Sequence, residues 1–375
     1  MYPQDAEPLF WVHINIDVPF HLKGVLYFPK IHRGFDFQSN AVHLFCNRVF
    51  VSDNCKDLLP DYLMVLKGAI DSPDIPLNVS RSHLQMDKTV RSLAQHISKK
   101  ILQKIEGLYK QDQARFLEIW PEIEMVVKLG ILQEENLYEK AKNFLVWNTL
   151  DGKWLTLEEI QKTCKEGDKK TVYYTTKDTK DLGVSKLYKE KNLPVLLTQP
   201  VIDNPLMQRL EDRLGVKFQR IDSVLEETLL DKGKEKTLLN AEGKSESALI
   251  EDFVRNALDK KDLTIEAKSL ASADTPAFFL IDEQSRRFKE FMMSHSRSND
   301  DAMLPQKKTF VINTNNLLIT KAFSLKNSQP NFAKKLVEHV YDLARLSQKE
   351  INTKDLSSLV ERSQEVLQEM IGLIG

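Results

Sequence analysis

The spacing of apolar residues changes sharply near the start of this chain, and this change restricts the folds it can adopt. Residues 9–18 carry apolar side chains at alternating positions, which is the pattern of a half-buried β-strand. Strand-like runs follow at 24–28 and 42–51, and the short connection between the first two favours antiparallel pairing. From 86 to about 110, apolar residues recur every three or four positions, as on one face of a long helix. Strands followed by a long helix predict a mixed α and β domain.

A second region alternates between strand-like and helix-like runs. Two shorter helices are expected first, at 112–127 and 135–147. The alternating strands and helices are then expected at 171–176, 178–191, 194–198, 204–214 and 216–221. Buried strands separated by helices are typical of a small parallel α/β subdomain. No GxGxxG sequence follows any of these strands, so the usual dinucleotide-binding pattern is missing.

The remainder of the chain begins with a charge-rich stretch, 223–247, that predicts a flexible linker. Its Gly243-Lys244-Ser245 is like the end of a phosphate-binding loop, but Leu238 occupies the position of the required glycine. We therefore reject a nucleotide site there. The expected elements beyond it are a helix at 248–259, strand-like runs at 265–271, 274–282 and 308–313, a methionine-rich helix at 283–294, and terminal helices at 331–347 and 353–374.

The charge balance and the cysteine pattern exclude several classes of protein. With 53 basic and 54 acidic residues, the net charge of −1 creates no overall field for nucleic acid or acidic membranes. Three irregularly spaced cysteines suit a reducing compartment, and no apolar run reaches about 20 residues, so we expect a cytoplasmic protein without a membrane span. The eight histidines form no HExxH, and GxSxG is absent. We expect no metal site and keep an unrelated enzyme as a minor alternative.

The segment 71–88, DSPDIPLNVSRSHLQMDK, is the most informative part of the sequence. Two prolines mark it as a loop that enters the long helix, with Ser80 or Asp87 as its N-cap. Arg81 lies at or near this helix N-terminus, where amide groups and a guanidinium both donate to an anion. The alternative is a helix cap beside an ordinary surface arginine.

This segment closely resembles the middle-domain catalytic loop of the ninety-kilodalton heat-shock chaperone family, in its bacterial HtpG form. Ser82 departs from the family pattern, which usually has glutamate there. The runs 24–30, 47–68, 172–176 and 274–282 resemble other stretches of the family in the same order. The matching residues of the loop are Asp71, Ser72, Asp74, Pro76, Leu77, Asn78, Ser80, Arg81, Leu84 and Gln85.

The resemblance implies an α+β/α/β, multi-domain fold, with an α/β/α middle domain followed by a mixed α/β C-terminal dimerisation domain. The large α/β subdomain with the catalytic loop would span 1–130 and the small α/β subdomain 131–222. A linker would follow at 223–247, and the C-terminal dimerisation and client-contact domain at 248–375. The family's N-terminal ATPase domain would be absent.

In this family an N-terminal domain binds ATP with Mg²⁺, and the middle domain lends an arginine to the γ-phosphate. The resemblance assigns that role to Arg81, with Asn78 and Gln85 supporting the loop. The negative charge spread over the transferring phosphoryl group would face the planar guanidinium of Arg81, which stays protonated. Because no glycine-rich nucleotide lid is found, we expect this chain alone to bind no cofactor and to hydrolyse negligible ATP.

The resemblance also implies binding of unfolded client proteins and a homodimer. The expected client contacts are Gln284, Phe288, Phe291 and Met292 on the helix 283–294, Leu206 and Met207, and Phe35 and Phe37. Pro205 occupies the position where bacterial members carry a client-contacting tryptophan, which puts the Leu206 contact in doubt. Ordinary core packing is the alternative for the helix 283–294, and a buried anchor is the alternative for Phe35 and Phe37. The expected dimer contacts are Leu336, Val340, Leu343, Leu359, Val366 and Met370 on the two terminal helices.

The proposed activity is therefore that of a chaperone portion that binds clients and completes ATP hydrolysis in an N-terminal ATPase domain. The alternative is an ATP-independent, dimeric client-binding or scaffold protein. An N-terminal ATPase domain encoded upstream would favour the first function, and its absence would favour the second.

Overall fold

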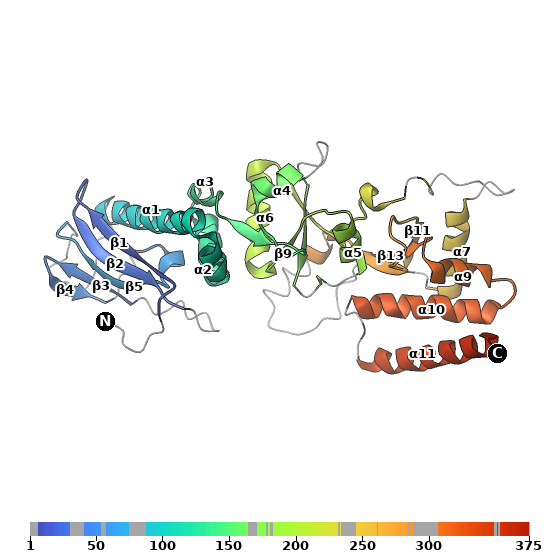
Figure 1. The fold of residues 1–375 in the computed structure, drawn as a ribbon. Helices are drawn as coiled ribbons and strands as arrows, with labels where there is room; N and C mark the ends of the chain where they lie inside the picture. Colours follow the sequence, from blue (N-terminus) through green and yellow to red (C-terminus); the bar gives the residue numbers. More distant parts are fainter. Residues whose placement is uncertain are drawn as a thin grey trace. The chain divides into compact units, whose positions relative to one another are not determined.

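The structure is a computed structural model that falls into two compact units (Figure 1). The first unit comprises Met1–Val146 with Ile202–Arg209, and the second comprises Trp147–Val201 with Leu210–Gly375. The structure describes residues 7–30, 41–53, 58–74, 88–163, 171–177, 179–180, 183–231, 233, 245–260, 262–283, 285–287, 307–348, 351 and 353–374.

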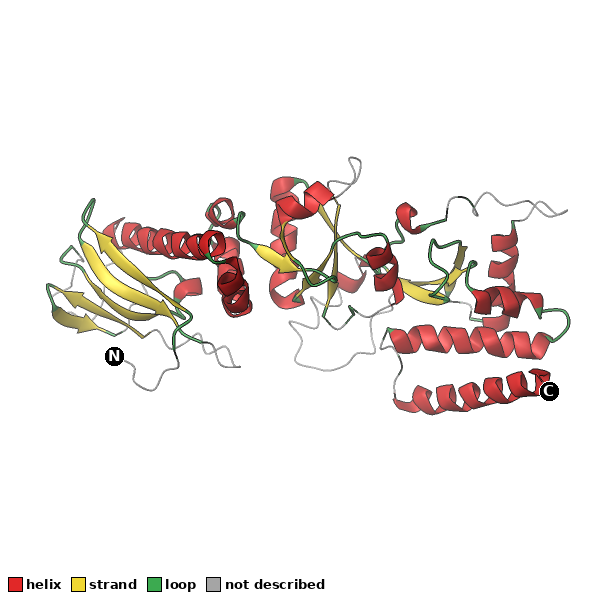
Figure 2. Cartoon of the chain, viewed as in Figure 1, coloured by secondary structure: helices red, strands yellow, loops and turns green. Residues whose placement is uncertain are grey.

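The first unit is built on a five-stranded sheet in the order β1-β2-β5-β3-β4 (Figure 2). The strands are β1 (Phe10–Ile16), β2 (Leu22–Phe28), β3 (Ala41–Cys46), β4 (Val49–Ser52) and β5 (Lys67–Asp71). The antiparallel pairing of β1 with β2 confirms the prediction. The single strand predicted at 42–51 is wrong, because Asn47 and Arg48 adopt positive φ and turn the chain into an antiparallel hairpin.

One face of this sheet is covered by the long helix α1 (Lys88–Gln111). The predicted stripe on that helix is buried at Val90, Leu93, Ile97, Ile101 and Ile105. It meets the inward side chains of the strands, which alternate with outward ones as the pleat requires. A 3-10 turn (Asp61–Leu63) and the helices α2 (Gln113–Gln133) and α3 (Leu137–Ala141) complete this unit together with part of α6 (Pro200–Leu214).

The second unit begins with a three-stranded sheet in the order β10-β8-β9. Both pairings are parallel, as the alternating strands and helices predicted. The elements of this part are β6 (Val146–Asn148), β7 (Trp154–Thr156), α4 (Leu157–Thr163), β8 (Thr171–Thr176), α5 (Gly183–Glu190), β9 (Val195–Thr198) and β10 (Lys217–Arg220).

A second three-stranded sheet follows in the same unit, in the order β11-β13-β12. Strand β13 pairs in parallel with β11 and antiparallel with β12. Apolar side chains of both sheet and helices form its core, including Phe279, Phe310 and Val337. The elements are α7 (Glu246–Leu258), β11 (Thr264–Lys268), β12 (Ala277–Ile281), β13 (Lys308–Asn313), α9 (Leu317–Ser324), α10 (Pro330–Ser347) and α11 (Thr353–Ile374).

The first part of the predicted linker 223–247 is folded. A 3-10 turn (Glu227–Leu229) buries Leu229 in a core shared by the two sheets of the second unit. The backbone of Leu230 bridges to Leu270, and Asp231 N–H donates to the Ser269 carbonyl at 2.8 Å. Apolar packing on residues distant in sequence outweighs the local charge of this stretch.

Candidate functional site

The start of the segment 71–88 is fixed at the end of β5 by backbone hydrogen bonds. Asp71 Oδ2 accepts from the Arg48 backbone N–H at 2.9 Å, in the turn between β3 and β4. Ser72 is buried, and its N–H donates to the Phe45 carbonyl at 3.1 Å. These bonds attach the two residues to strands that come much earlier in the chain, so this end of the segment cannot shift independently of the sheet.

The connection between β1 and β2 holds the same segment from a second side. Ser72 Oγ donates to the His21 carbonyl at 2.6 Å, and the His21 N–H donates to Asp74 Oδ2, also at 2.6 Å. The neighbouring Phe20 is buried, with its ring centroid 5.0 Å from that of His96 in α1. One short connection therefore contacts both the start of the segment and the helix that follows it.

Three of the predicted catalytic side chains, Asn78, Arg81 and Gln85, lie outside the described residues. Ser72 and Asp74, which the sequence singled out only as matches to a family pattern, now have a physical role as anchors of the loop. No sequence pattern indicated His21 as their partner, since it lies 51 and 53 positions away from them.

A charged cluster lies around Glu283, Arg286 and Arg287, in the second unit. Glu283 Oε1 accepts three hydrogen bonds: from Arg286 Nη2 at 2.6 Å, from Arg287 Nε at 2.7 Å and from Tyr174 Oη at 2.8 Å. Arg286 is buried and also donates to Tyr174 Oη at 2.7 Å. Arg287 reaches Glu211 on α6 at 3.4 Å. We call Tyr174, Glu211, Glu283, Arg286 and Arg287 the Glu283 cluster.

The electrostatics of the Glu283 cluster favour the ionised carboxylate. Burial acts to raise the pKa of Glu283, but Arg286 and the donated hydrogen bonds outweigh it and hold that pKa below its usual value. Burial raises the pKa of Tyr174 to about 12, so the phenol stays protonated and can donate. The cluster therefore joins β8, α6 and residues 283, 286 and 287 through charge-assisted hydrogen bonds.

A second buried ion pair lies beside this cluster. Arg220 Nε is 2.9 Å from Asp222 Oδ1, and both residues are buried. Burial raises the pKa of Asp222 even though Arg220 opposes the shift. The Asp222 carbonyl accepts from the Ile281 N–H at 2.8 Å, which ties the end of β10 to β12.

Six of the eight predicted client contacts lie outside the described residues: Gln284, Phe288, Phe291, Met292, Phe35 and Phe37. The other two, Leu206 and Met207, are 0% and 1% exposed in α6. A side chain buried to this degree offers no surface to a client, so both residues act as core residues in this structure. The neighbouring Pro205 lies inside the same helix.

The terminal helices divide the predicted dimer contacts into buried and exposed side chains. Val340, Leu359 and Val366 are buried, and Leu336 packs on the core beneath α10. Leu343 and Met370 are exposed. Additional exposed apolar side chains on the same two helices are Leu346, Leu356, Val360, Leu367 and Ile371.

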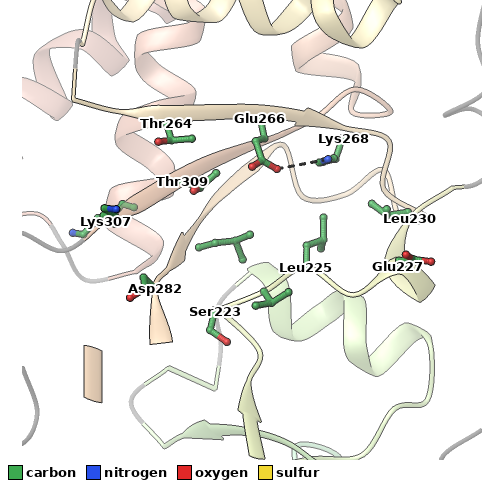
Figure 3. A pocket seen from close by; sticks show the side chains of 13 residues that line it. Ser223, Leu225, Glu227, Leu230, Thr264, Glu266, Lys268, Asp282, Lys307 and Thr309 are labelled. Atoms are coloured by element: carbon green, nitrogen blue, oxygen red, sulfur yellow. Dashed lines mark ion pairs between the residues drawn. The ribbon is translucent and has the colours of Figure 1, made fainter. Parts of the chain in front are cut away.

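A groove opens over the sheet of β11, β13 and β12 and has a volume of about 810 Å³ (Figure 3). The segment around Leu225 and Leu230 forms its other wall, and Glu266 pairs with Lys268 at 3.6 Å. Its basic residues Lys268, Lys307 and Lys308 are balanced by the acidic residues Glu227, Glu266 and Asp282. Three charges of each sign give the groove no net charge with which to select an ionic cofactor.

The described ranges contain neither a clustered metal site nor a membrane-spanning helix. Within them, no group of three or more His, Cys, Asp or Glu side chains is placed to hold a metal ion. Among the described helices, none is both long and apolar enough to cross a membrane.

The comparisons with known proteins agree with the resemblance drawn from the segment 71–88. A profile of the Hsp90 protein family matches residues 2–374. Chaperone protein htpG of Bacteroides fragilis strain YCH46 is 33% identical over 332 residues, which cover 86% of this chain and 49% of that protein. Chaperone protein HtpG of Porphyromonas gingivalis strain ATCC 33277 is 34% identical over 333 residues, with coverages of 86% and 48%.

A third relative extends the match over almost the whole chain. Chaperone protein HtpG of Helicobacter acinonychis strain Sheeba is 30% identical over 373 residues, which cover 97% of this chain and 57% of that protein. The chain thus spans about half the length of the curated relatives it matches. The family profile covers both compact units, and the mixed α/β architecture agrees with it. This chain belongs to the Hsp90 protein family.

Proposed function

We propose that this chain is the portion of a chaperone that binds client proteins, forms a homodimer, and supplies Arg81 to ATP held by a separate N-terminal domain. The observation that carries the proposal is the attachment of the segment 71–88. Ser72 and Asp74 are hydrogen-bonded to His21, and Phe20 packs on His96 of α1, so one connection contacts both the start of the segment and the helix that follows it.

This attachment supports a catalytic role because an arginine that stabilises a transition state must be positioned before the reaction occurs. A guanidinium matches the spread charge of a transferring phosphoryl group and stays protonated. In related reactions, an arginine supplied from another domain accelerates phosphoryl transfer by about 10³ or more. Asn78 and Gln85 would orient the loop, and ATP with Mg²⁺ would belong to the partner domain.

The test measures ATP hydrolysis by an isolated ATPase domain of a full-length relative, with and without this chain. We expect negligible hydrolysis by the chain alone and stimulation of the added domain. Arg81→Ala should remove most of the stimulation, whereas Arg91→Ala, an exposed arginine on α1, should leave it intact. Equal stimulation by the Arg81→Ala variant would remove this arginine from the mechanism.

The proposed homodimer rests on an apolar stripe on α11. Leu356, Val360, Leu367 and Ile371 are exposed and fall on one side of the helix at steps of four, seven and four residues. Leu359 and Val366 point to α10 instead, because they are buried. Burying the exposed stripe against a second copy would form a four-helix bundle with two-fold symmetry. We therefore propose this stripe, and not the buried Leu359 and Val366, as the contact between the two copies.

Light scattering on matched variants tests the dimer. Leu367→Glu combined with Ile371→Glu should give a monomer, because two charges would enter the apolar contact. Ser357→Glu combined with Gln368→Glu adds the same charge at exposed positions outside the stripe and should keep the dimer. A dimer that survives the first pair of changes would place the contact elsewhere.

Client binding is proposed for the helix 283–294, through Phe288, Phe291 and Met292. Exposed methionine and phenylalanine side chains adapt to varied apolar partners. Suppression of the aggregation of a heat-denatured test protein should fall when all three are changed to serine. Unchanged suppression would reject the assignment of these side chains.

A further inference from the structure

The outer face of the five-stranded sheet in the first unit is rich in exposed aromatic side chains. On β1 and β2 the register pairs Trp11 with Tyr27 and His13 with Val25 on this face, because the alternate residues point to α1. Trp11 is 54% exposed and Val25 40% exposed. Helix α1 covers only the opposite face of the sheet, through the side chains buried there.

The aromatic face continues across the strands to β4. Phe45 pairs with Phe50, and their ring centroids lie 5.8 Å apart. Phe50 is 52% exposed even though it contacts both Phe45 and His43. Strand pairing therefore gathers exposed apolar side chains from β1, β2, β3 and β4 on one surface, which folded proteins usually reserve for a partner.

A hollow lies at the centre of this face. Ala69 on β5 pairs with Val25 on one side and His43 on the other, and its small side chain leaves space above the strand. The hollow has a volume of about 600 Å³ and is lined by Val25, Tyr27 and Phe45 together with the backbone of Gly68. This volume is large enough for one or two apolar side chains of a partner.

The rim of the hollow is basic. Lys23 and Arg48 line it together with the single carboxylate of Asp71, and Lys67 lies beside it, paired with Tyr27 on the same face. That carboxylate already accepts a hydrogen bond from the Arg48 backbone N–H. Three basic side chains against one acidic one give the rim a net charge of +2, although the whole chain carries −1. An acidic partner is therefore favoured over a basic one.

We propose that the outer face of this sheet binds an acidic protein segment that carries aromatic or large aliphatic anchors. The anchors fill the hollow above Ala69 and pack on Trp11 and Phe50, while carboxylates meet the basic rim. This surface shares only Asp71 with the segment 71–88, and it includes no residue of the predicted helix 283–294 or of the terminal helices. It therefore adds a protein-binding site that does not depend on the proposed function.

Trp11 provides a direct readout of occupancy. The chain has four tryptophans, of which Trp120 and Trp147 are buried and Trp154 is half-buried, whereas Trp11 lies on the proposed surface. We would add a short peptide in which glutamate alternates with phenylalanine and leucine. The expected result is a blue shift of the emission and protection from acrylamide quenching, both lost in the Trp11→Phe variant.

The strand β4 offers a matched pair of variants for the affinity measurement. Phe50 and Val49 are adjacent and similarly exposed, at 52% and 54%, but they point to opposite faces of the sheet. We expect Phe50→Ser to weaken binding of the labelled peptide by about fivefold to tenfold. Val49→Ser should leave the affinity within about twofold of the original.

Charge provides the second arm of the experiment. The same peptide with lysine in place of every glutamate should bind at least about tenfold more weakly, since the rim repels it. Raising the salt concentration should weaken binding of the acidic peptide, because salt screens the attraction between exposed charges. Equal binding of the two peptides, or equal binding by the Phe50→Ser variant, would overturn the proposal. Trp11 could also become protected from quenching when the chain alone is concentrated. If Phe50→Ser removed that protection, the occupant would be a second copy of the chain, and the proposal would equally be overturned.

Discussion

Neutralising Glu283 should destabilise the second unit, because this side chain is the shared acceptor of the Glu283 cluster. Glu283→Gln keeps an oxygen in place for Tyr174 but removes the negative charge that faces Arg286 and Arg287. A hydrogen bond to a charged group contributes about 1.5–3 kcal/mol, and a neutral one about 0.5–1.5 kcal/mol. The bonds from Arg286 and Arg287 to residue 283 are both weakened, and Arg286 stays buried without its closest anion.

The expected loss is about 2–3 kcal/mol in the free energy of unfolding. It remains below the cost of an entirely unpaired buried charge because Arg286 also interacts with Asp222. For a unit of this size, each kcal/mol lowers the melting temperature by about 2–4 °C, so scanning calorimetry should show a decrease of about 4–12 °C. Glu266→Gln, which removes the same charge from an exposed pair with Lys268, should change stability by less than about 0.5 kcal/mol.

The pH dependence gives an independent measurement of the same cluster. Because the pKa of Glu283 is lower in the folded chain than in the unfolded one, its stabilising effect is complete above its ordinary pKa. That effect is lost as the pH falls through the folded value, and Glu283→Gln should remove this part of the acid sensitivity. Asp222 has the opposite sign, since its raised pKa means that protonation relieves a burial cost at low pH. A Glu283→Gln variant with unchanged melting temperature and acid sensitivity would refute the electrostatic role assigned to the cluster.

Three further changes test the packing of the first unit, each by urea unfolding. Gly68→Ala should lower the free energy of unfolding by more than about 2 kcal/mol, because φ is +145° and an added Cβ would clash with the Val25 carbonyl oxygen. Its control is Gly107→Ala, on open helix surface, which should raise the free energy of unfolding by about 0.5–1 kcal/mol. Lys128→Met should cost about 3–5 kcal/mol, because it leaves the fully buried Asp203, 2.9 Å from Lys128 Nζ, without its cation. Ser72→Ala should cost about 1–2 kcal/mol and leave the His21 carbonyl without this donor.

Local patterns in the sequence predicted the regular elements of this fold well. The alternation in residues 9–18 and the apolar stripe of α1 arise from one sheet face and one helix face, so they are visible without knowledge of the partner surface. The hairpin at Asn47 and Arg48 was missed because no glycine or proline marks the turn. Asparagine tolerates positive φ, but that preference alone does not identify a turn.

Long-range contacts explain what the sequence could not predict. The folding of Leu229 depends on Leu270, Phe278 and Val311, which lie 40 or more positions later, so its charged neighbours gave a misleading signal. The Glu283 cluster was also missed, although Glu283, Arg286 and Arg287 show the spacing of three and four residues expected on one helix face. Only the burial of Arg286 distinguishes this cluster from an ordinary surface ion pair.

Ion pairs join the two terminal helices in addition to the buried side chains of Leu359 and Val366, and this bears directly on the proposed dimer. Lys335 on α10 contacts Glu369 at 2.6 Å and Glu365 at 3.1 Å, and Arg345 contacts Asp355 at 2.6 Å. Such exposed ion pairs fix the orientation of a helix more than they stabilise it. They leave the apolar stripe of α11 facing outward, so its burial against a second copy would add hydrophobic stabilisation to that from Leu359 and Val366. Salt should therefore weaken the pairing of α11 with α10 while leaving the apolar contact between copies intact.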